Sequence, residues 1–130
     1  MFALVDTTVL IDFVRGRPTD QVRKLDLLID AGGVVVGDLI LCEFLRGFDT
    51  EADARRVQQT LSRFASVELC GADIAVEAAA NYRRLRALGI TVRKTVDLIV
   101  GTYCIQHALP LLHNDRDYDP MAKHLGLRVL

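Results

Sequence analysis

Short runs of consecutive apolar residues alternate along the chain with segments in which apolar residues recur at helical spacing. Continuous apolar runs of this length are typical of strands that are buried on both faces of a sheet. They lie at residues 2–5, 34–36 and 110–112, and apolar stretches interrupted by polar residues predict two further short strands at 66–69 and 127–130. Helical spacing is found at residues 8–15, 20–30, 38–46, 51–64, 74–88 and 97–107, and a final helical turn begins at 119.

This alternation of strands and helices predicts the fold class. Strands that are separated by helices form parallel sheets, and the connecting helices cover both faces. We therefore expect an α/β fold, namely an α/β/α sandwich with a central, mainly parallel sheet of four to five strands. Because domains typically run to roughly 100–150 residues, we expect residues 1–130 to form a single domain.

Polar residues mark the starts of several predicted helices. Thr50, with an acid three residues later, forms a variant of the capping box. Asp38, Asp73 and Asp119 precede helical segments and are interpreted as N-caps. Pro120 follows Asp119 and suits the first helical position, where a missing N–H costs little.

The composition is that of an ordinary globular protein, with 51% apolar and 25% charged residues. No apolar run approaches the roughly 20 residues that span a bilayer, and the first residues lack the basic start of a signal peptide. Cys42, Cys70 and Cys104 are widely spaced and set among apolar residues, and they are interpreted as reduced core thiols of a cytoplasmic protein. The net charge of −1 excludes a bulk basic surface for nucleic acid.

Candidate chemistry begins with carboxylates that directly follow predicted strands. Asp6 follows the first strand, and Asp115 and Asp117 follow the fourth. Sites in open α/β sheets form at the carboxyl ends of strands, where strand order reverses. If the first and fourth strands are neighbours, Asp6 and Asp115 face each other.

Two further carboxylates come from helices. Glu43 shares the apolar stripe of Leu39 and Ile40, which places a charge against the body of the protein. Asp97 shares a face of small residues with Gly101 and Cys104, and it lies in the first helical turn, where the helix dipole favours its ionised form.

Carboxylates that converge on one crevice repel each other and raise each other's pKa values, and a divalent cation resolves this repulsion. An all-oxygen ligand set indicates Mg²⁺, with Mn²⁺ as a substitute. Such an ion activates water for phosphodiester hydrolysis. The bases that could hold a phosphate nearby are Arg93 and Lys94, with Arg15, Arg46 and Arg116 as further candidates.

The order of these motifs resembles a known family. The chain reads VDTTVLID, then LCEFLRG, TVDLIVGTYCIQH and LPLLHNDRDYD, and closes with LGLRVL. This order resembles the PIN domain, and more narrowly the VapC-type toxin ribonucleases of bacterial toxin–antitoxin systems, over essentially the whole chain. The resemblance implies a metal-dependent endoribonuclease that cuts RNA, such as transfer RNA or another structured RNA. It also implies a homodimer, a cognate VapB-type antitoxin and no membrane partner.

The resemblance assigns roles by position. Asp6, Glu43, Asp97 and Asp115 match the four acids of the family and are the expected catalytic residues and metal ligands. Asp117 matches an additional acid, either as a ligand or as a residue that supports one. Thr7 or Thr8 matches the small hydroxyl residue beside the first acid. The sequence departs from the family at one position.

The family usually carries Thr or Ser two residues before the fourth acid, and His113 stands there instead. This histidine could donate to a phosphate, bind the metal weakly or only fill the space. The departure bears on metal preference and pH dependence and leaves the fold prediction unchanged.

Each residue also has a simpler interpretation. Glu43 could form a buried ion pair with Arg46, and Asp97 taken alone only complements the helix dipole. Tyr118 is interpreted as a packing residue and Asp12 as a solvated helix acid.

Two other function classes are compatible with the predicted scaffold. A non-catalytic module would bind metal or RNA without cutting it. An aspartyl-phosphate enzyme fits poorly, because Thr8 stands where a second acid is required after the first strand. Residues 13–48 carry apolar side chains on short helices, where an amphipathic partner helix could dock and an arginine of that partner could displace the metal.

Overall fold

Four short parallel strands form the centre of the computed structural model, which describes residues 1–130. The strands are β1 Ala3–Val5, β2 Val34–Gly37, β3 Ala65–Val67 and β4 Leu111–Leu112. They lie in the order β3-β2-β1-β4, so the first and last strands are neighbours, as the sequence predicts. Leu4 is aligned with Val35 on one side and with Leu111 on the other.

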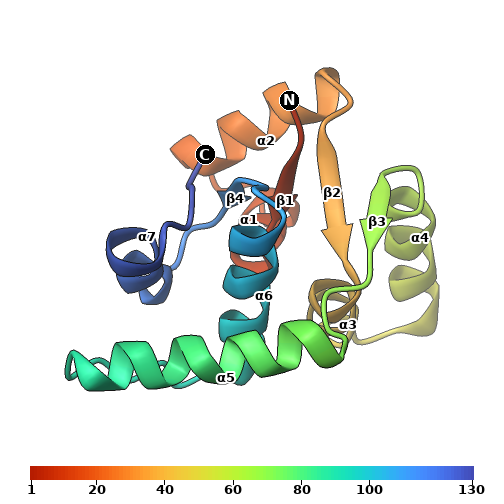
Figure 1. Cartoon of the computed structure of the whole chain (residues 1–130). Helices are drawn as coiled ribbons and strands as arrows, with labels where there is room; N and C mark the ends of the chain where they lie inside the picture. Colours follow the sequence, from red (N-terminus) through yellow and green to blue (C-terminus); the bar gives the residue numbers. More distant parts are fainter.

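Helices form the two outer layers. They are α1 Thr7–Val14, α2 Asp20–Asp30, α3 Asp38–Leu45, α4 Glu51–Leu61, α5 Ala72–Ala87, α6 Thr95–Gln106 and α7 Asp119–Leu125, with a 3₁₀ helix η1 at Arg116–Tyr118. Helix α1 packs on α2 and α3, whereas α5 packs along α6. In Figure 1, α2 lies at the end of the sheet where the strands begin, and α5 runs past the end where they finish.

The central strand β1 explains why the apolar runs are continuous. Its three residues are fully buried, because β2 and β4 pair with its edges and helices cover its faces. All four residues of β2 are buried as well. The predicted α/β/α architecture with a parallel sheet is therefore confirmed, and it brings the carboxyl ends of β1 and β4 together.

Helix starts agree only in part with the predicted caps. The Thr50 hydroxyl accepts a hydrogen bond from the backbone N–H of Asp53 at 3.1 Å, so this cap is confirmed. Asp73 is not a cap, because the extended residue Gly71 precedes α5 and its carbonyl already accepts from Ala75. Asp119 is not a cap either, because it follows η1 and its backbone is already helical.

The cysteines agree only in part with the prediction. Cys104 is buried, whereas Cys42 and Cys70 are exposed, so the interpretation as core thiols is wrong for two of the three.

Two other sequence predictions need correction. The N-cap of α3 is Gly37, and Asp38 accepts instead from the backbone N–H groups of Leu39 and Leu69, at 2.8 and 3.0 Å. The last apolar run is not a full strand, because only Val129 forms a parallel bridge, to Leu111. No helix has both the length and the apolar character needed to cross a membrane.

Candidate functional site

Asp6 lies where β1 passes into α1, and the start of the helix fixes its carboxylate. The side chain caps α1, and its Oδ2 accepts from the N–H and the hydroxyl of Thr8, at 3.2 and 2.7 Å. The same hydroxyl accepts from the backbone N–H of Asn114 at 3.0 Å. The loop after β4 is therefore bonded, through Thr8, to the first carboxylate.

The hydroxyl of Tyr118 links the carboxylates of Asp6 and Asp97. The Tyr118 hydroxyl lies 2.9 Å from Asp6 Oδ1 and 3.3 Å from Asp97 Oδ1, and its side chain is fully buried. Burial and the two acids raise the pKa of Tyr118, so the hydroxyl keeps its proton and acts as a donor. The sequence interpretation of Tyr118 as a packing residue therefore missed its polar role.

Asp97 lies in the first turn of α6 and is buried. Burial raises its pKa from 3.8 to about 6, and repulsion from Asp6, Asp115 and Glu43 adds to this shift, while Lys94 opposes it. Its Oδ2 atom is buried and has no hydrogen-bond partner. A buried carboxylate oxygen without a donor is costly, and a cation would satisfy it.

Asp115 and Asp117 lie near Asp97, and together with Asp6 these residues form what we call the acidic group. Ligand atoms of Asp97, Asp115 and Asp117 all lie within 4.8 Å of one another. Asp115 Oδ1 accepts from the backbone N–H of Asp117 at 2.9 Å, and Lys94 Nζ lies 3.8 Å from Asp115 Oδ2. This all-oxygen donor set, together with the unpartnered oxygen of Asp97, fits a divalent cation such as Mg²⁺.

Glu43 lies at the edge of the group and is only half-buried. Its Oε1 accepts from the Thr7 hydroxyl at 3.2 Å, and its charge contributes to the raised pKa of Asp97. It forms no ion pair with Arg46, so the simpler interpretation of Glu43 is wrong. Arg15 lines a small cavity of about 150 Å³ together with Glu43.

His113 supports the turn that carries the last two acids. Its Nδ1 accepts from the backbone N–H of Asp115 at 3.1 Å, and its ring lies on that of Tyr118, with centroids 4.8 Å apart. Burial lowers the pKa of His113, and its Nε2 is buried without a partner. Neither ring nitrogen is open to a phosphate, so the geometry favours the space-filling interpretation.

Asp12 is a second polar residue that the sequence interpretation placed wrongly. It is buried, not solvated, and accepts from Arg17 Nη1 and from Asn114 Nδ2, both at 3.1 Å. Asp12 lies four residues after Thr8 on α1, so both residues bond the loop after β4 from one helix face. The signal in the sequence was a lone acid in an otherwise apolar helix.

Comparison with known proteins agrees with this arrangement. The sequence model of the PIN domain matches residues 3–124. Among curated proteins, the chain is 26% identical over 129 residues to the VapC ribonuclease Mb1587 of Mycobacterium bovis and to the ribonuclease VapC11 of Mycobacterium tuberculosis. Both matches cover 97% of this chain and 96% of the relative.

Similar solved structures share the fold. The crystal structure of VapBC2 from Rickettsia felis, bound to a DNA fragment from their promoter, has a TM-score of 0.79 at 16% identity and covers 100% of this chain and 98% of that one. A toxin–antitoxin complex from Klebsiella pneumoniae has a TM-score of 0.68 at 24% identity, with 89% of each chain covered. Since the PIN model spans most of the sequence, the chain belongs to the PIN domain family.

Proposed function

We propose that this chain is the toxin of a toxin–antitoxin pair and acts as a metal-dependent endoribonuclease. The observation that carries the proposal is the unpartnered, buried Oδ2 of Asp97 beside the carboxylates of Asp115 and Asp117. The similarity to VapC ribonucleases over nearly the whole length supports RNA as the substrate. We propose further that residues 1–130 form one PIN domain.

Five carboxylates would hold Mg²⁺, with Mn²⁺ as a substitute. Ligand oxygens of Asp97, Asp115 and Asp117 lie within 4.8 Å of one another, and the Tyr118 hydroxyl links Asp6 to Asp97. Glu43 is the fifth carboxylate. When bound there, such an ion would supply a lowered pKa of water and charge stabilisation at the phosphate.

Glu43 has a second role beside the metal, and Lys94 adds positive charge. We assign to Glu43 the acceptance of a proton from the attacking water at Oε2, because its Oε1 is already held by Thr7. Lys94 lies beside Asp115 and supplies positive charge at the edge of the acidic group, where the substrate phosphate would arrive. The catalytic residues in this proposal are Asp6, Glu43, Asp97 and Asp115.

The first experiment incubates purified protein with a pool of small RNAs in Mg²⁺, in Mn²⁺ and in EDTA. We expect discrete fragments that require metal and that disappear in Asp97→Asn. Asp73→Asn is the matched control, because Asp73 is exposed on α5, and it should cut like the original chain. Metal-dependent cleavage by Asp97→Asn would refute the assignment, and a folded protein that binds Mn²⁺ but cuts no RNA would favour a non-catalytic module.

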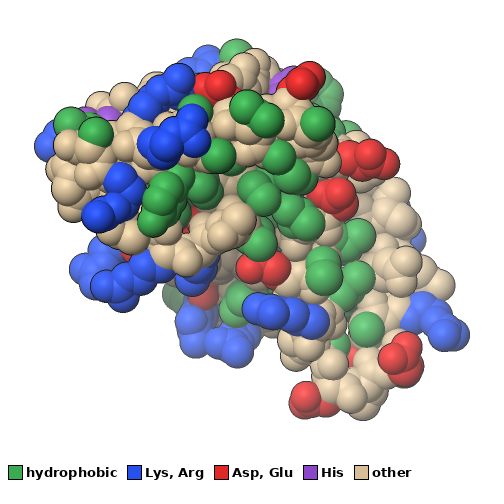
Figure 2. All heavy atoms as spheres, turned by 60° about the horizontal axis from the view of Figure 1, so that its bottom comes forward, with side chains coloured by type: hydrophobic (Ala, Val, Ile, Leu, Met, Phe, Trp, Pro, Cys, Tyr) green, Lys and Arg blue, Asp and Glu red, His purple; other side chains and the backbone are tan.

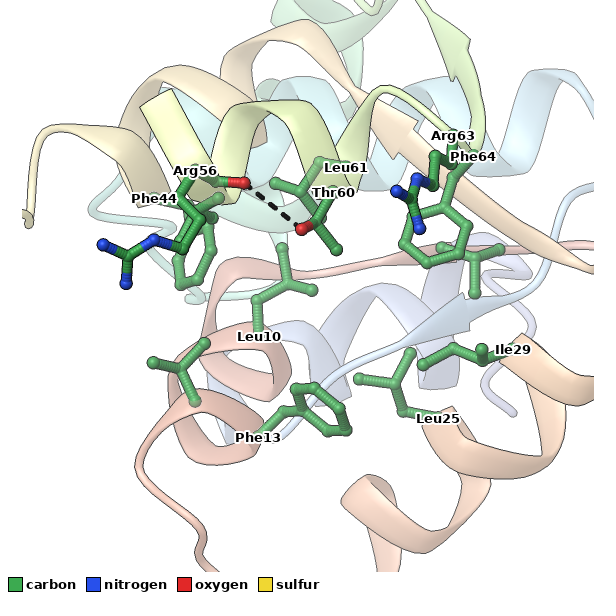
Figure 3. A pocket seen from close by; sticks show the side chains of 13 residues that line it. Leu10, Phe13, Leu25, Ile29, Phe44, Arg56, Thr60, Leu61, Arg63 and Phe64 are labelled. Carbon is green, nitrogen blue, oxygen red and sulfur yellow. Dashed lines mark hydrogen bonds between the residues drawn. The ribbon is translucent and has the colours of Figure 1, made fainter. Parts of the chain in front are cut away.

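An apolar groove of about 480 Å³ offers a surface for the antitoxin. Figure 3 shows Leu10 and Phe13 of α1 and Leu25 of α2 on one side, opposite Phe44 and Leu61. Arg56 and Arg63 also line the groove. We assign the groove to an amphipathic helix of a VapB-type antitoxin, whose apolar face would fill it and whose acids would meet these arginines.

This assignment is supported by the neighbouring solved structures, which are toxin–antitoxin complexes. Helix α1 lines the groove and begins at Asp6, so a partner that extends past the groove comes close to the acidic group. An arginine of that partner could pair with these carboxylates and displace the metal.

Capture by the antitoxin from the native operon tests the groove. We expect Phe13→Asp to lose the antitoxin on co-purification while keeping its ribonuclease activity, because Phe13 is already 41% exposed. Leu27→Asp on α2 is the control, since Leu27 is more exposed and lies outside the groove. Equal capture by both variants would refute the assignment.

A second copy of the chain is the other partner that we propose. Figure 2 shows hydrophobic side chains gathered across the face on which α5 lies. Val76 and Tyr82 of α5 are exposed, and Ala75 and Ala79 line a cavity of about 360 Å³ between α5 and α6. Two-fold symmetric interfaces use the same patch on both subunits, and small alanines allow two helices to approach closely.

A further inference from the structure

A second pocket opens beside the acidic group. Its volume is about 340 Å³, at the lower end of the roughly 300–1,000 Å³ typical of small-molecule sites. Residues 90–93 of the connection between α5 and α6 form one wall, and Arg116, Asp117 and Pro120 form the other. We call it the Arg93–Arg116 pocket. Asp117 belongs both to this pocket and to the acidic group, so the two are continuous.

The pocket holds more positive than negative charge. Arg93 and Arg116 both line it, are exposed, and form no salt bridge or side-chain hydrogen bond. The only acid in the lining is Asp117, which also faces the other carboxylates of the site. Unpaired guanidinium groups are suited to phosphate, because their planar fork donates two hydrogen bonds at once.

The rest of the lining does not resemble a site for a bare anion. Ile90 and Val92 on one wall and Pro120 on the other give the pocket apolar surface. Thr91 adds a hydroxyl, whose oxygen accepts from Arg86 Nη1 at 2.9 Å and whose proton stays available to a ligand. An apolar wall beside a hydroxyl and two guanidinium groups fits a sugar or base attached to a phosphate.

The wall formed by residues 90–93 is held in place without a ligand. Gly89 ends α5 with φ near +80°, a conformation that favours glycine, and turns the chain toward the pocket. The N–H of Ile90 then donates to the carbonyl of Leu85 at 2.9 Å, and Arg86 holds Thr91. A preformed wall lowers the ordering cost of binding.

We infer that the Arg93–Arg116 pocket binds one nucleotide of the RNA strand next to the phosphodiester bond that is cut. Arg93 and Arg116 hold its phosphate, and Ile90, Val92 and Pro120 contact its sugar or base. The inference rests on the proposed ribonuclease function and adds where the substrate strand lies beyond the metal. The local positive charge of two arginines also explains how a chain with net charge −1 can hold RNA beside five carboxylates.

The first test measures nucleotide binding without cleavage. Adenosine and uridine 5′-monophosphate are titrated into the metal-free chain, and NMR follows the backbone amides of the pocket. We expect shifts at Thr91, Val92, Arg93 and Arg116, and binding at least tenfold weaker in the double variant Arg93→Ala/Arg116→Ala. Arg55→Ala, an exposed and unpaired arginine on α4, is the control and should bind as the original chain does.

Two outcomes of this titration would overturn the inference. One is that the original chain and the double variant respond equally, including the case in which neither binds. The other is that inorganic phosphate shifts the same amides with equal affinity, which would reduce the pocket to an anion site. Because no cleavage is involved, nucleotide binding that depends on both arginines supports the pocket even if the chain proves not to cut RNA.

A second test uses RNA in the Asp97→Asn background, where no cleavage is expected. A mixed-sequence RNA of ten nucleotides is titrated in Mg²⁺ at several salt concentrations. The double variant Arg93→Ala/Arg116→Ala should lose one phosphate contact. We therefore expect the negative slope of log K against log salt to become shallower by about 0.7 in this variant. In the cleaving chain, the double variant should raise KM while kcat changes less than twofold, and loss of kcat at unchanged KM would count against the pocket.

Discussion

One hydroxyl proton lies between two carboxylates in this molecule. Tyr118 donates to Asp6 at 2.9 Å and lies 3.3 Å from Asp97, so it reduces the repulsion between them without a metal. Its raised pKa keeps the proton in place across the physiological range. Tyr118 therefore acts as a positioning residue that holds the carboxylates of Asp6 and Asp97 beside each other.

Tyr118→Phe tests this role. The ring still fills its site, but both carboxylates lose a donor, so we expect Mn²⁺ affinity to fall by roughly ten- to a hundredfold. We expect the free energy of unfolding to fall by about 1.5–3 kcal/mol, because the hydroxyl donates to buried carboxylates. Calorimetric titration with Mn²⁺ measures the first quantity, and urea unfolding measures the second.

Tyr103→Phe is the matched control, because the Tyr103 hydroxyl on α6 forms no hydrogen bond with another side chain. It should bind Mn²⁺ as the original chain does. Unchanged metal affinity in Tyr118→Phe would show that the hydroxyl only fills space.

Residue roles could be predicted from the sequence only where position within an element identifies them. The neighbouring positions of β1 and β4, which Asp6 and Asp115 follow, were predictable because strand ends are local signals. The roles of Tyr118 and Asp12 were not, because their partners are far along the chain, 112 residues away for the bond from Tyr118 to Asp6. Local spacing carries no information about such contacts.

At the scale of elements, a glycine sets how closely α6 approaches α7. A Cβ atom at Gly101 would overlap with the sulfur of Met121. Helix α6 carries Asp97, and η1, which leads directly into α7, carries Asp117 and Tyr118. The contact at Gly101 therefore controls the distance between the ligands on α6 and those on η1.

Gly101→Ala is expected to destabilise the protein by about 1–3 kcal/mol through overpacking, despite the higher helix propensity of alanine. It should also weaken Mn²⁺ binding, because α7 has to move away from Asp97. Gly71→Ala is the control, since a Cβ there meets no atom within 4 Å. Thermal unfolding and Mn²⁺ titration measure both effects, and a Gly101→Ala variant as stable as the control would contradict this account.

The order of the elements was predictable because apolar spacing and breaks at glycine are local signals. The confirmed sheet and the start of α4 at Thr50 follow from them. The helix η1 was not predicted, since it is a single turn of three residues that follows its N-cap, Asp115. The last apolar run was overestimated as a strand, because apolar character alone does not specify how many backbone pairs form.

At the scale of the whole molecule, the acidic group lowers stability at neutral pH when no metal is bound. The pKa of Asp97 is raised from 3.8 to about 6, so folding favours its protonated form. That contribution is complete below pH 3.8 and is lost as the pH rises through about 6. We expect urea unfolding in EDTA to show the chain less stable at pH 7.5 than at pH 5.

Asp97→Asn isolates this contribution from other titrating groups. One pKa unit corresponds to about 1.4 kcal/mol, and the variant should gain on the order of 1–2 kcal/mol over the original chain at pH 7.5 in EDTA. Mg²⁺ should remove most of that difference by stabilising only the original chain. Asp73→Asn should follow the original chain, and an identical pH slope in Asp97→Asn would contradict the assignment.

The proposed dimer gives a prediction of mass. Val76 is 71% exposed on α5, so Val76→Glu should leave the fold intact and place two like charges at a symmetric interface. Light scattering is expected to give a dimer for the original chain and a monomer for this variant. Leu27→Glu, an equally exposed site on α2, should remain a dimer, and a monomeric original chain would refute the proposal.

The residues of the groove come earlier in the sequence than most residues of the acidic group. Every residue that lines the groove lies between Leu10 and Phe64, whereas the acidic group also requires Asp97, Asp115 and Asp117. During translation, the groove residues leave the ribosome before the carboxylates of α6 and of the loop after β4 have been added. An unfinished chain therefore carries the sequence of the proposed antitoxin surface before it carries all of the carboxylates proposed to cut RNA.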